Sequence, residues 1–158
     1  MAINKVNYGG NTLIDITDTT ATPESVESGK VFYQADGTRA LGTGASDTGW
    51  VNLTSSTGTW TYLRYRVIGK MVYIEGHASS LKFSGSATTI VNSTNAIPSA
   101  YRPSNIKYAI SSVGGSRIAR FWVATEGTIG LDWTINVSNG SNYTTAIWQQ
   151  FNIVYLID

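Results

Sequence analysis

The residue types that perform catalysis are few in this chain. His77 is the single histidine and cysteine is absent, so any serine nucleophile would need to lie beside that one side chain. We interpret His77 as an ordinary residue on a polar strand face. One histidine among scattered carboxylates is also too little for a zinc or two-metal site. We therefore expect neither a metal nor a cofactor.

Glycoside hydrolysis needs less, because two carboxylates roughly 5–10 Å apart suffice. The candidates after residue 50 are Glu75, Glu126 and Asp132. Glu75 is expected opposite Arg64, which would keep it ionised, the wrong state for a general acid. Glu126 lies in a predicted turn, and Asp132 points away from the core-facing side of its strand. We expect the protein not to be an enzyme.

Saccharide binding fits these residues better, since it uses aromatic faces for the sugar ring and short polar side chains for its hydroxyls. The loop 136–145, NVSNGSNYTT, places several Asn and Ser residues around one aromatic ring. It is uncharged, which favours a neutral ligand. Two tryptophans flank predicted strands, and two places are open to each of them, the rim of a binding site or the core. The predicted saccharide-binding residues are Tyr143, Asn142, Asn139, Trp60 and Trp148.

The stretch 61–77, TYLRYRVIGKMVYIEGH, predicts the β-hairpin around which the fold is organised. Gly69-Lys70 is the expected two-residue turn, because glycine accepts the positive φ of tight hairpin turns. One face should be buried and the other should meet water or a partner. The predicted apolar pairs are Val67 with Val72, Tyr65 with Ile74 and Leu63 with Gly76. The predicted polar pairs are Arg66 with Tyr73, Arg64 with Glu75 and Tyr62 with His77.

The remaining sequence from Trp50 onward reads as short strands separated by turn residues. Strands are predicted over 88–92, 106–113, 117–125, 128–137 and 148–157, with turns at Gly114-Gly115, Glu126-Gly127 and 139–142. Core-facing alternation is expected at Ile129, Leu131, Trp133 and Ile135, and at Phe151, Ile153, Tyr155 and Ile157. This pattern predicts an all-β chain whose domain 50–158 is an antiparallel β-sandwich or a jelly-roll-like head.

Residues 1–44 differ in character and predict a small α+β module. A strand is expected over 11–17, and a short helix from the N-cap Thr22 with Pro23 in its first turn and Gly29 as its stop. A hairpin over 31–41 turns at Ala35-Asp36-Gly37. A module this small buries too little to be stable alone, which indicates attachment or oligomerisation. The Gly/Ser/Thr segment 42–49 is predicted to be flexible, with 45–49 as the linker between the domains.

Composition narrows the classes of partner. Charged residues make up 13% of the 158 residues and the net charge is +1, so neither nucleic acid nor an anionic membrane is indicated as a partner. No apolar stretch approaches the roughly 18 residues of a membrane span. The first ten residues, MAINKVNYGG, lack the apolar run of a secretory signal. A low-charge, cysteine-free chain of this kind is typical of extracellular or virion proteins, and host lysis is the expected route outside.

Two stretches resemble a known family. Residues 8–44, YGGNTLIDITDTTATPESVESGKVFYQADGTRALGTG, resemble modules of phage tail-fibre and minor structural proteins, in which a "YG…TLIDLT" strand leads through a short helix to a "DG…I.GT" hairpin. Residues 97–104, IPSAYRPS, follow strands containing YRVIGKMVYIEG and resemble the head of phage tail-tip receptor-binding proteins, with its "LP.GYRPS" turn. Ala100 stands where that pattern usually has glycine.

The resemblance implies a homotrimeric tail protein of the virion. Its N-terminal module would attach to other phage tail or baseplate proteins, and its head would touch a glycan of the host cell surface. Two alternatives stay open, a purely structural tail subunit whose head caps the assembly and a glycan depolymerase.

Overall fold

The computed structural model describes residues 2–157, and the chain divides into two compact units, Met1–Asp47 and Thr48–Asp158. We call them the N-terminal unit and the head and describe each by itself. The division falls within the segment 45–49. Gly42 does not belong to a flexible segment, because its N–H donates to the Lys30 carbonyl at 2.7 Å. A Cβ at Gly42 would lie 2.3 Å from the Glu27 carbonyl oxygen, so the backbones pack directly there.

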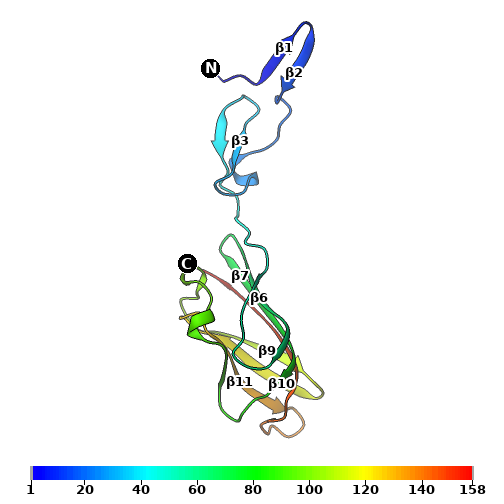
Figure 1. Ribbon diagram of the computed structural model, residues 1–158, viewed down its shortest axis with the longest axis vertical. Coiled ribbons are helices and arrows are strands. Elements are labelled where there is room, and N and C mark those ends of the chain that lie inside the picture. The colour runs from blue at the N-terminus through cyan, green and yellow to red at the C-terminus, as the bar shows by residue number, and fades with distance from the viewer. Residues whose placement is uncertain (1, 158) are drawn as a thin grey trace. The chain divides into compact units, whose positions relative to one another are not determined.

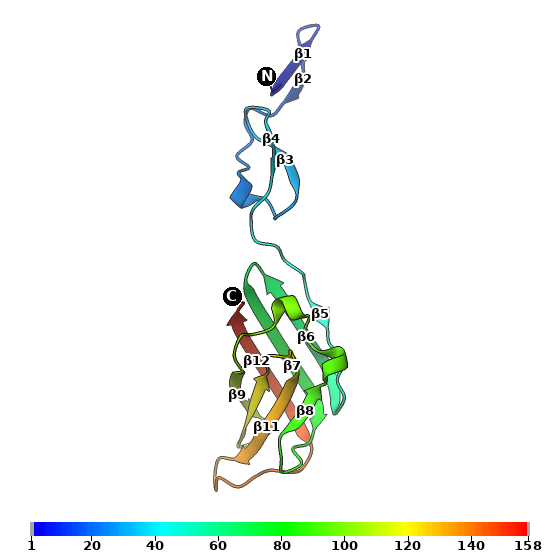
Figure 2. The same ribbon diagram turned by 90° about the vertical axis from the view of Figure 1, so that its left-hand side faces the viewer.

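The head is an antiparallel β-sandwich of two four-stranded sheets, which confirms the predicted fold class (Figure 2). One sheet, which we call the β6 sheet, has the order β12-β7-β6-β5, and the other, the β10 sheet, has the order β8-β11-β10-β9. The β10 sheet has Greek-key order, since β8 joins β9 by a long connection yet pairs with β11. The strands are β5 (Val51–Asn52), β6 (Thr59–Ile68), β7 (Met71–Leu81), β8 (Thr88–Val91), β9 (Lys107–Val113), β10 (Arg117–Val123), β11 (Ile129–Asn136) and β12 (Ile147–Leu156).

The β6–β7 hairpin has the predicted register throughout. The pairing runs from Ile68 with Met71, around Gly69-Lys70, to Tyr62 with His77, and all six predicted pairs are present. Gly69 has a φ of 59°, as the tight turn requires. Register shifts occur only beyond Tyr62, next to Trp60.

The core lies between the inner faces of the two sheets. Phe121 of β10 stacks on Phe151 of β12 with 4.5 Å between ring centroids. Gly76 makes room for this packing, because a Cβ there would lie 2.5 Å from Phe151 and 2.7 Å from the Trp60 ring. The predicted alternation of β12 is confirmed, with Phe151, Ile153 and Tyr155 buried.

The predicted alternation of β11 is wrong in its second half. Thr134 is fully buried, whereas Trp133 and Ile135 are only half-buried. The cause is a β-bulge: Phe121 pairs with Leu131 and Arg120 with Trp133, so Asp132 is left over and the side chains beyond it exchange faces. Sequence alternation alone does not reveal such an extra residue.

The head has two structurally distinct ends. Thr48 marks one, where its N–H donates to the Val67 carbonyl at 3.0 Å beside the β6–β7 turn. The opposite end carries the turn 114–116 and the loop 137–146 (Figure 1). We call this opposite end the distal end of the head. Two 3-10 turns, η2 (Ser93–Asn95) and η3 (Ser99–Tyr101), connect β8 to β9.

The N-terminal unit consists of two small hairpins. Its elements are β1 (Lys5–Tyr8), β2 (Asn11–Asp15), η1 (Pro23–Ser25), β3 (Val31–Tyr33) and β4 (Arg39–Leu41). The predicted helix is only a single 3-10 turn, which ends at Ser25 and does not reach the predicted stop at Gly29. The Ser25 hydroxyl accepts a hydrogen bond from the Thr22 N–H and closes that turn, after which Glu27 forms a bridge with Gly44. The strand β1 was not predicted.

Burial in the N-terminal unit is minimal. Among its described residues only Gly37 and Gly42 are buried. Gly37 has a φ of 82° and lies against the Ile3 backbone. The exposed large apolar residues of the N-terminal unit are Ile3, Tyr8, Leu13, Ile14, Val31, Tyr33 and Leu41. Within residues 2–157, no helix has the length and hydropathy of a membrane span.

Candidate functional site

The distal loop is held in one shape by its own asparagines. The Asn136 Oδ1 accepts from the Ser138 N–H at 2.9 Å, and the Asn139 Oδ1 accepts from both the N–H and the hydroxyl of Ser141. Gly140, with a φ of 70°, is the central residue of the second of these two Asx turns. The side-chain oxygen of one predicted saccharide-binding residue, Asn139, is therefore engaged in building the loop, while Asn142 is exposed.

Tyr143 is half-buried rather than free at a loop tip. Its N–H donates to the Thr134 carbonyl at 2.7 Å, and its ring lies 3.8 Å from the Arg117 guanidinium carbon. Arg117 also donates to the Gly114 carbonyl. One face of the predicted stacking platform is thus covered by a cation, and the loop site carries a charge that its own sequence lacks.

Trp148 lies close to this cluster. Its carbonyl accepts from the Gly114 N–H at 3.2 Å, and its indole Nε1 lies 3.2 Å from where a Gly114 Cβ would be. The side chain is 44% exposed. Through the turn at Gly114, the distal end brings together Trp148, Arg117 and Tyr143.

Trp60 belongs to the core and not to a rim. Its ring packs edge-on against Phe151, with centroids 6.1 Å apart. Its indole N–H donates to the Thr57 carbonyl at 2.8 Å. The register shift beside Trp60 turns this ring inward, so we exclude it from the candidate site.

The outer face of the β6 sheet carries a row of rings, most of which are not among the predicted saccharide-binding residues. The ring centroids of His77 and Trp148 lie 6.4 Å apart, and those of Tyr62 and His77 lie 5.8 Å apart. The Arg64 guanidinium lies 4.9 Å from the Tyr62 ring and 4.5 Å from the Trp50 ring. We call these five side chains the aromatic strip. The hairpin register already placed three of them on one outward face, but the position of Trp50 depends on β5, which was not predicted by itself.

Two of the carboxylates considered for catalysis are in ion pairs. Glu75 accepts from the Arg64 Nε at 2.6 Å, and Asp132 accepts from the Arg120 Nε at 2.7 Å. Because Glu75 lies on β7 and Asp132 on β11, they belong to different sheets and do not face a common substrate.

The third carboxylate, Glu126, is in the turn between β10 and β11. Hydrogen bonds from its own backbone N–H and from the Thr128 hydroxyl lower the pKa of Glu126, which favours the ionised form. Among residues 2–157 no group of three His, Asp or Glu side chains could hold a metal ion. The absence of enzymatic activity stays a prediction.

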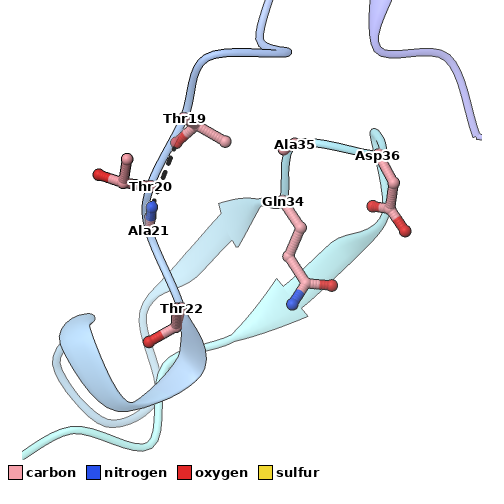
Figure 3. Close-up of a pocket in the computed structure, with 7 residues that line it drawn as sticks. All are labelled: Thr19, Thr20, Ala21, Thr22, Gln34, Ala35 and Asp36. Atoms are coloured by element: carbon pink, nitrogen blue, oxygen red, sulfur yellow. Dashed lines mark hydrogen bonds between the residues drawn. The ribbon is translucent and has the colours of Figure 1, made fainter.

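The N-terminal unit has an open hollow of about 410 Å³ between the segment 19–22 and the turn 34–36 (Figure 3). Its polar lining is mostly threonine hydroxyl and the Gln34 amide. The one carboxylate there, Asp36, accepts from the Thr38 N–H at 2.8 Å. The lining offers neither a nucleophile–base pair nor an aromatic platform, so we do not assign it a ligand.

No protein-family model matches this chain, and no curated protein matches it.

Proposed function

We propose that the protein is a phage, or prophage-derived, tail protein whose head binds a saccharide on the host cell surface. The tail assignment rests on the resemblance of residues 8–44 and 97–104 to tail-fibre and receptor-binding proteins. It implies a location in the virion, or outside the cell after host lysis. Other phage tail or baseplate proteins would bind the N-terminal unit.

The observation that carries saccharide binding is the grouping of aromatic and amide side chains at the distal end of the head. Trp148 supplies an exposed indole, and Tyr143 presents the ring face that Arg117 leaves uncovered. Asn142 and the Asn139 amide nitrogen supply hydrogen bonds to hydroxyl groups. Each such site would be weak, so several copies in one assembly would raise the avidity on a dense glycan.

Self-association follows from the N-terminal unit. It exposes large apolar side chains and buries none among its described residues, which is unusual for an isolated folded unit. Ile3, Ile14, Ile16 and Tyr33 line an apolar hollow of about 300 Å³. Further copies of the chain would cover these side chains, and the number three comes from the resemblance.

The test of saccharide binding is adsorption of the labelled, intact chain to a panel of bacterial strains. Asn142→Ala and Tyr143→Ala should reduce adsorption to the strain that is bound, with little change in the melting temperature for Asn142→Ala. The matched control is Asn105→Ala, an exposed asparagine away from the distal end. Wild-type adsorption to none of the strains, or full adsorption by both distal variants, would refute this function at this site.

One observation favours the structural alternative. The strand β9 and the residue before it expose Ile106, Tyr108 and Ile110, the last of them 64% exposed. An apolar edge of this kind suits packing against another protein. If Ile110→Ser disrupts assembly while the distal variants change nothing, the head caps the assembly and does not bind a receptor.

A further inference from the structure

We infer that the aromatic strip of the β6 sheet is a binding track for an extended, neutral polysaccharide chain. This inference rests on the proposed function and specifies its ligand: several consecutive sugar units of a linear glycan rather than one terminal sugar. The occupant is a polysaccharide of the host cell envelope, and its track lies along the flat face of the head rather than in the distal loop alone.

The geometry of the strip is continuous across four strands. It begins at Trp148 on β12, continues through His77 on β7 and Tyr62 and Arg64 on β6, and ends at Trp50 beside β5. Neighbouring strands lie about 4.8 Å apart, so the strip spans roughly 14 Å. Both end residues are open to solvent, with Trp148 44% and Trp50 41% exposed. A track of this length with an exposed indole at each end accommodates several sugar rings.

Hydrogen-bonding side chains accompany the rings along the strip. The sheet register aligns Asn152, Glu75, Arg64 and Asn52 in one row across the strands. In the neighbouring row, Gln150 is aligned with His77 and Tyr62. The amides of Gln150, Asn152 and Asn52 are all exposed. Amides both donate and accept, which suits sugar hydroxyls, since a hydroxyl also does both.

The charge along the strip indicates a neutral ligand. Its one cation, Arg64, is held by Glu75 at 2.6 Å and stacks between Tyr62 and Trp50. The pair leaves no net charge to attract a carboxylate or phosphate group. The distal loop differs in its charge. There Arg117, which stacks on Tyr143, has no carboxylate partner in the ion pairs of the described residues.

The outer face of the β10 sheet has a similar ionic arrangement but different neighbours. There Arg120 is paired with Asp132 and lies 4.8 Å from the Tyr108 ring. The exposed side chains around it are apolar, including Ile106 and Ile110. That face lacks the amides a saccharide needs, and it therefore supplies a matched control: Tyr108, an exposed aromatic stacked on a paired arginine.

Affinity electrophoresis of the intact chain tests the inference. The gels contain dextran, galactomannan, hydroxyethyl cellulose or soluble starch as neutral polymers, and alginate or hyaluronan as charged ones. We expect retardation by at least one neutral polymer and by neither charged polymer. Trp50→Ala and Tyr62→Ala should each weaken that binding about tenfold, which corresponds to about 1.4 kcal/mol. Tyr108→Ala should bind like the wild type.

Two further measurements exclude misfolding of the variants, and binding by the distal loop alone, as explanations of the result. Gln150→Ala and Asn152→Ala remove exposed amides without removing a packed ring, and they should also weaken binding. Oligosaccharides of the retained polymer should compete only when they are several units long, while the monosaccharide should not compete.

The outcomes separate this inference from the proposed function. Wild-type retardation that Trp50→Ala, Tyr62→Ala, Gln150→Ala and Asn152→Ala all leave unchanged would overturn the track. Saccharide binding by the distal loop would then still stand. Retardation only by charged polymers, or by none, would also overturn the track, and the adsorption test on bacterial strains then decides the proposed function separately.

Discussion

Thr134 shows how a single buried hydroxyl affects stability. Its side chain is fully buried, and its Oγ1 has no hydrogen-bond partner within residues 2–157. Since an unpartnered buried hydroxyl is destabilising, Thr134→Val should raise the free energy of unfolding by about 1 kcal/mol in urea denaturation. The control is Thr128→Val. This change removes a hydroxyl that donates a hydrogen bond to the Glu126 carboxylate at 2.9 Å, and it should lower the free energy of unfolding by a similar amount. A loss of stability in Thr134→Val would mean that water satisfies this hydroxyl.

The Arg64–Glu75 pair should contribute little to stability. Both side chains are partly exposed, at 34% and 22%, and exposed ion pairs are worth at most about 1 kcal/mol. Arg64 also keeps its stacking contacts when the charge of Glu75 is removed. Glu75→Gln should therefore change the melting temperature only slightly. A large drop would indicate that this face of the β6 sheet is covered by another subunit, which would also argue against the polysaccharide track.

Residue partners could be predicted only where the sequence sets the register. The hairpin turn fixed Arg64 opposite Glu75 and Tyr62 opposite His77, because residues close in sequence must pair there. The contact between Tyr143 and Arg117 depends on how a loop folds back over a distant turn. No local pattern encodes that contact, so the sequence of the loop indicates an uncharged site and does not reveal the cation that covers one face of the Tyr143 ring.

At the scale of elements, β12 is tied to η3 by a buried tyrosine. The Tyr155 hydroxyl donates to the Tyr101 carbonyl at 2.7 Å, and burial raises the pKa of Tyr155 above its ordinary value. The side chain of an unfolded tyrosine has a pKa of about 10. The stabilisation is therefore fully present below about pH 10 and is lost as the pH rises toward the folded pKa.

Tyr155→Phe tests this dependence. At pH 8 the variant should lose about 1 kcal/mol of stability through the missing hydrogen bond. Above pH 10 its stability should fall less steeply than that of the wild type, although Tyr65, whose pKa burial also raises, keeps part of the slope. Urea denaturation between pH 8 and pH 11 measures both. Identical slopes for the two proteins would contradict the account.

Most strands of the head were predictable because apolar and polar residues alternate along them and glycine or other turn residues bound them. The strands β6 to β12 were found this way, with boundaries within a few residues. The predicted strand faces and helix end were wrong where an inserted residue or a long-range backbone contact outweighs the local sequence pattern. The bulge at Asp132 inserts one residue into β11, and the bridge between Glu27 and Gly44 prevents a helix from continuing past Ser25.

At the scale of the whole molecule, we expect three chains to associate through their N-terminal units. Light scattering at micromolar concentration should give about three times the 17.0 kDa of one chain. Ile14→Ser, which makes an exposed apolar position in the N-terminal unit polar, should shift the mass toward the monomer. Val137→Ser, at an exposed apolar position of the head outside the β9 edge, is the control and should leave the mass unchanged. A monomeric wild-type chain would exclude self-association.

Composition and family resemblance predict an all-β tail protein, but they do not indicate which side chains lie together on a surface of the head. The all-β fold followed from turn spacing, and the coreless N-terminal unit followed from its length. The aromatic strip required the order of the β6 sheet, because Trp50 and Trp148 lie far apart in sequence and meet the same face only through β5 and β12. Long-range strand order is not contained in local periodicity.

The most direct test of the central claim asks whether the receptor is a saccharide. Bacterial cells that adsorb the intact chain are treated either with periodate, which cleaves the vicinal diols of sugars, or with a broad protease. Adsorption should be lost after periodate and retained after protease, because the candidate surfaces of the head combine exposed aromatic rings with neutral amides. Adsorption that survives periodate and disappears with protease would contradict the account.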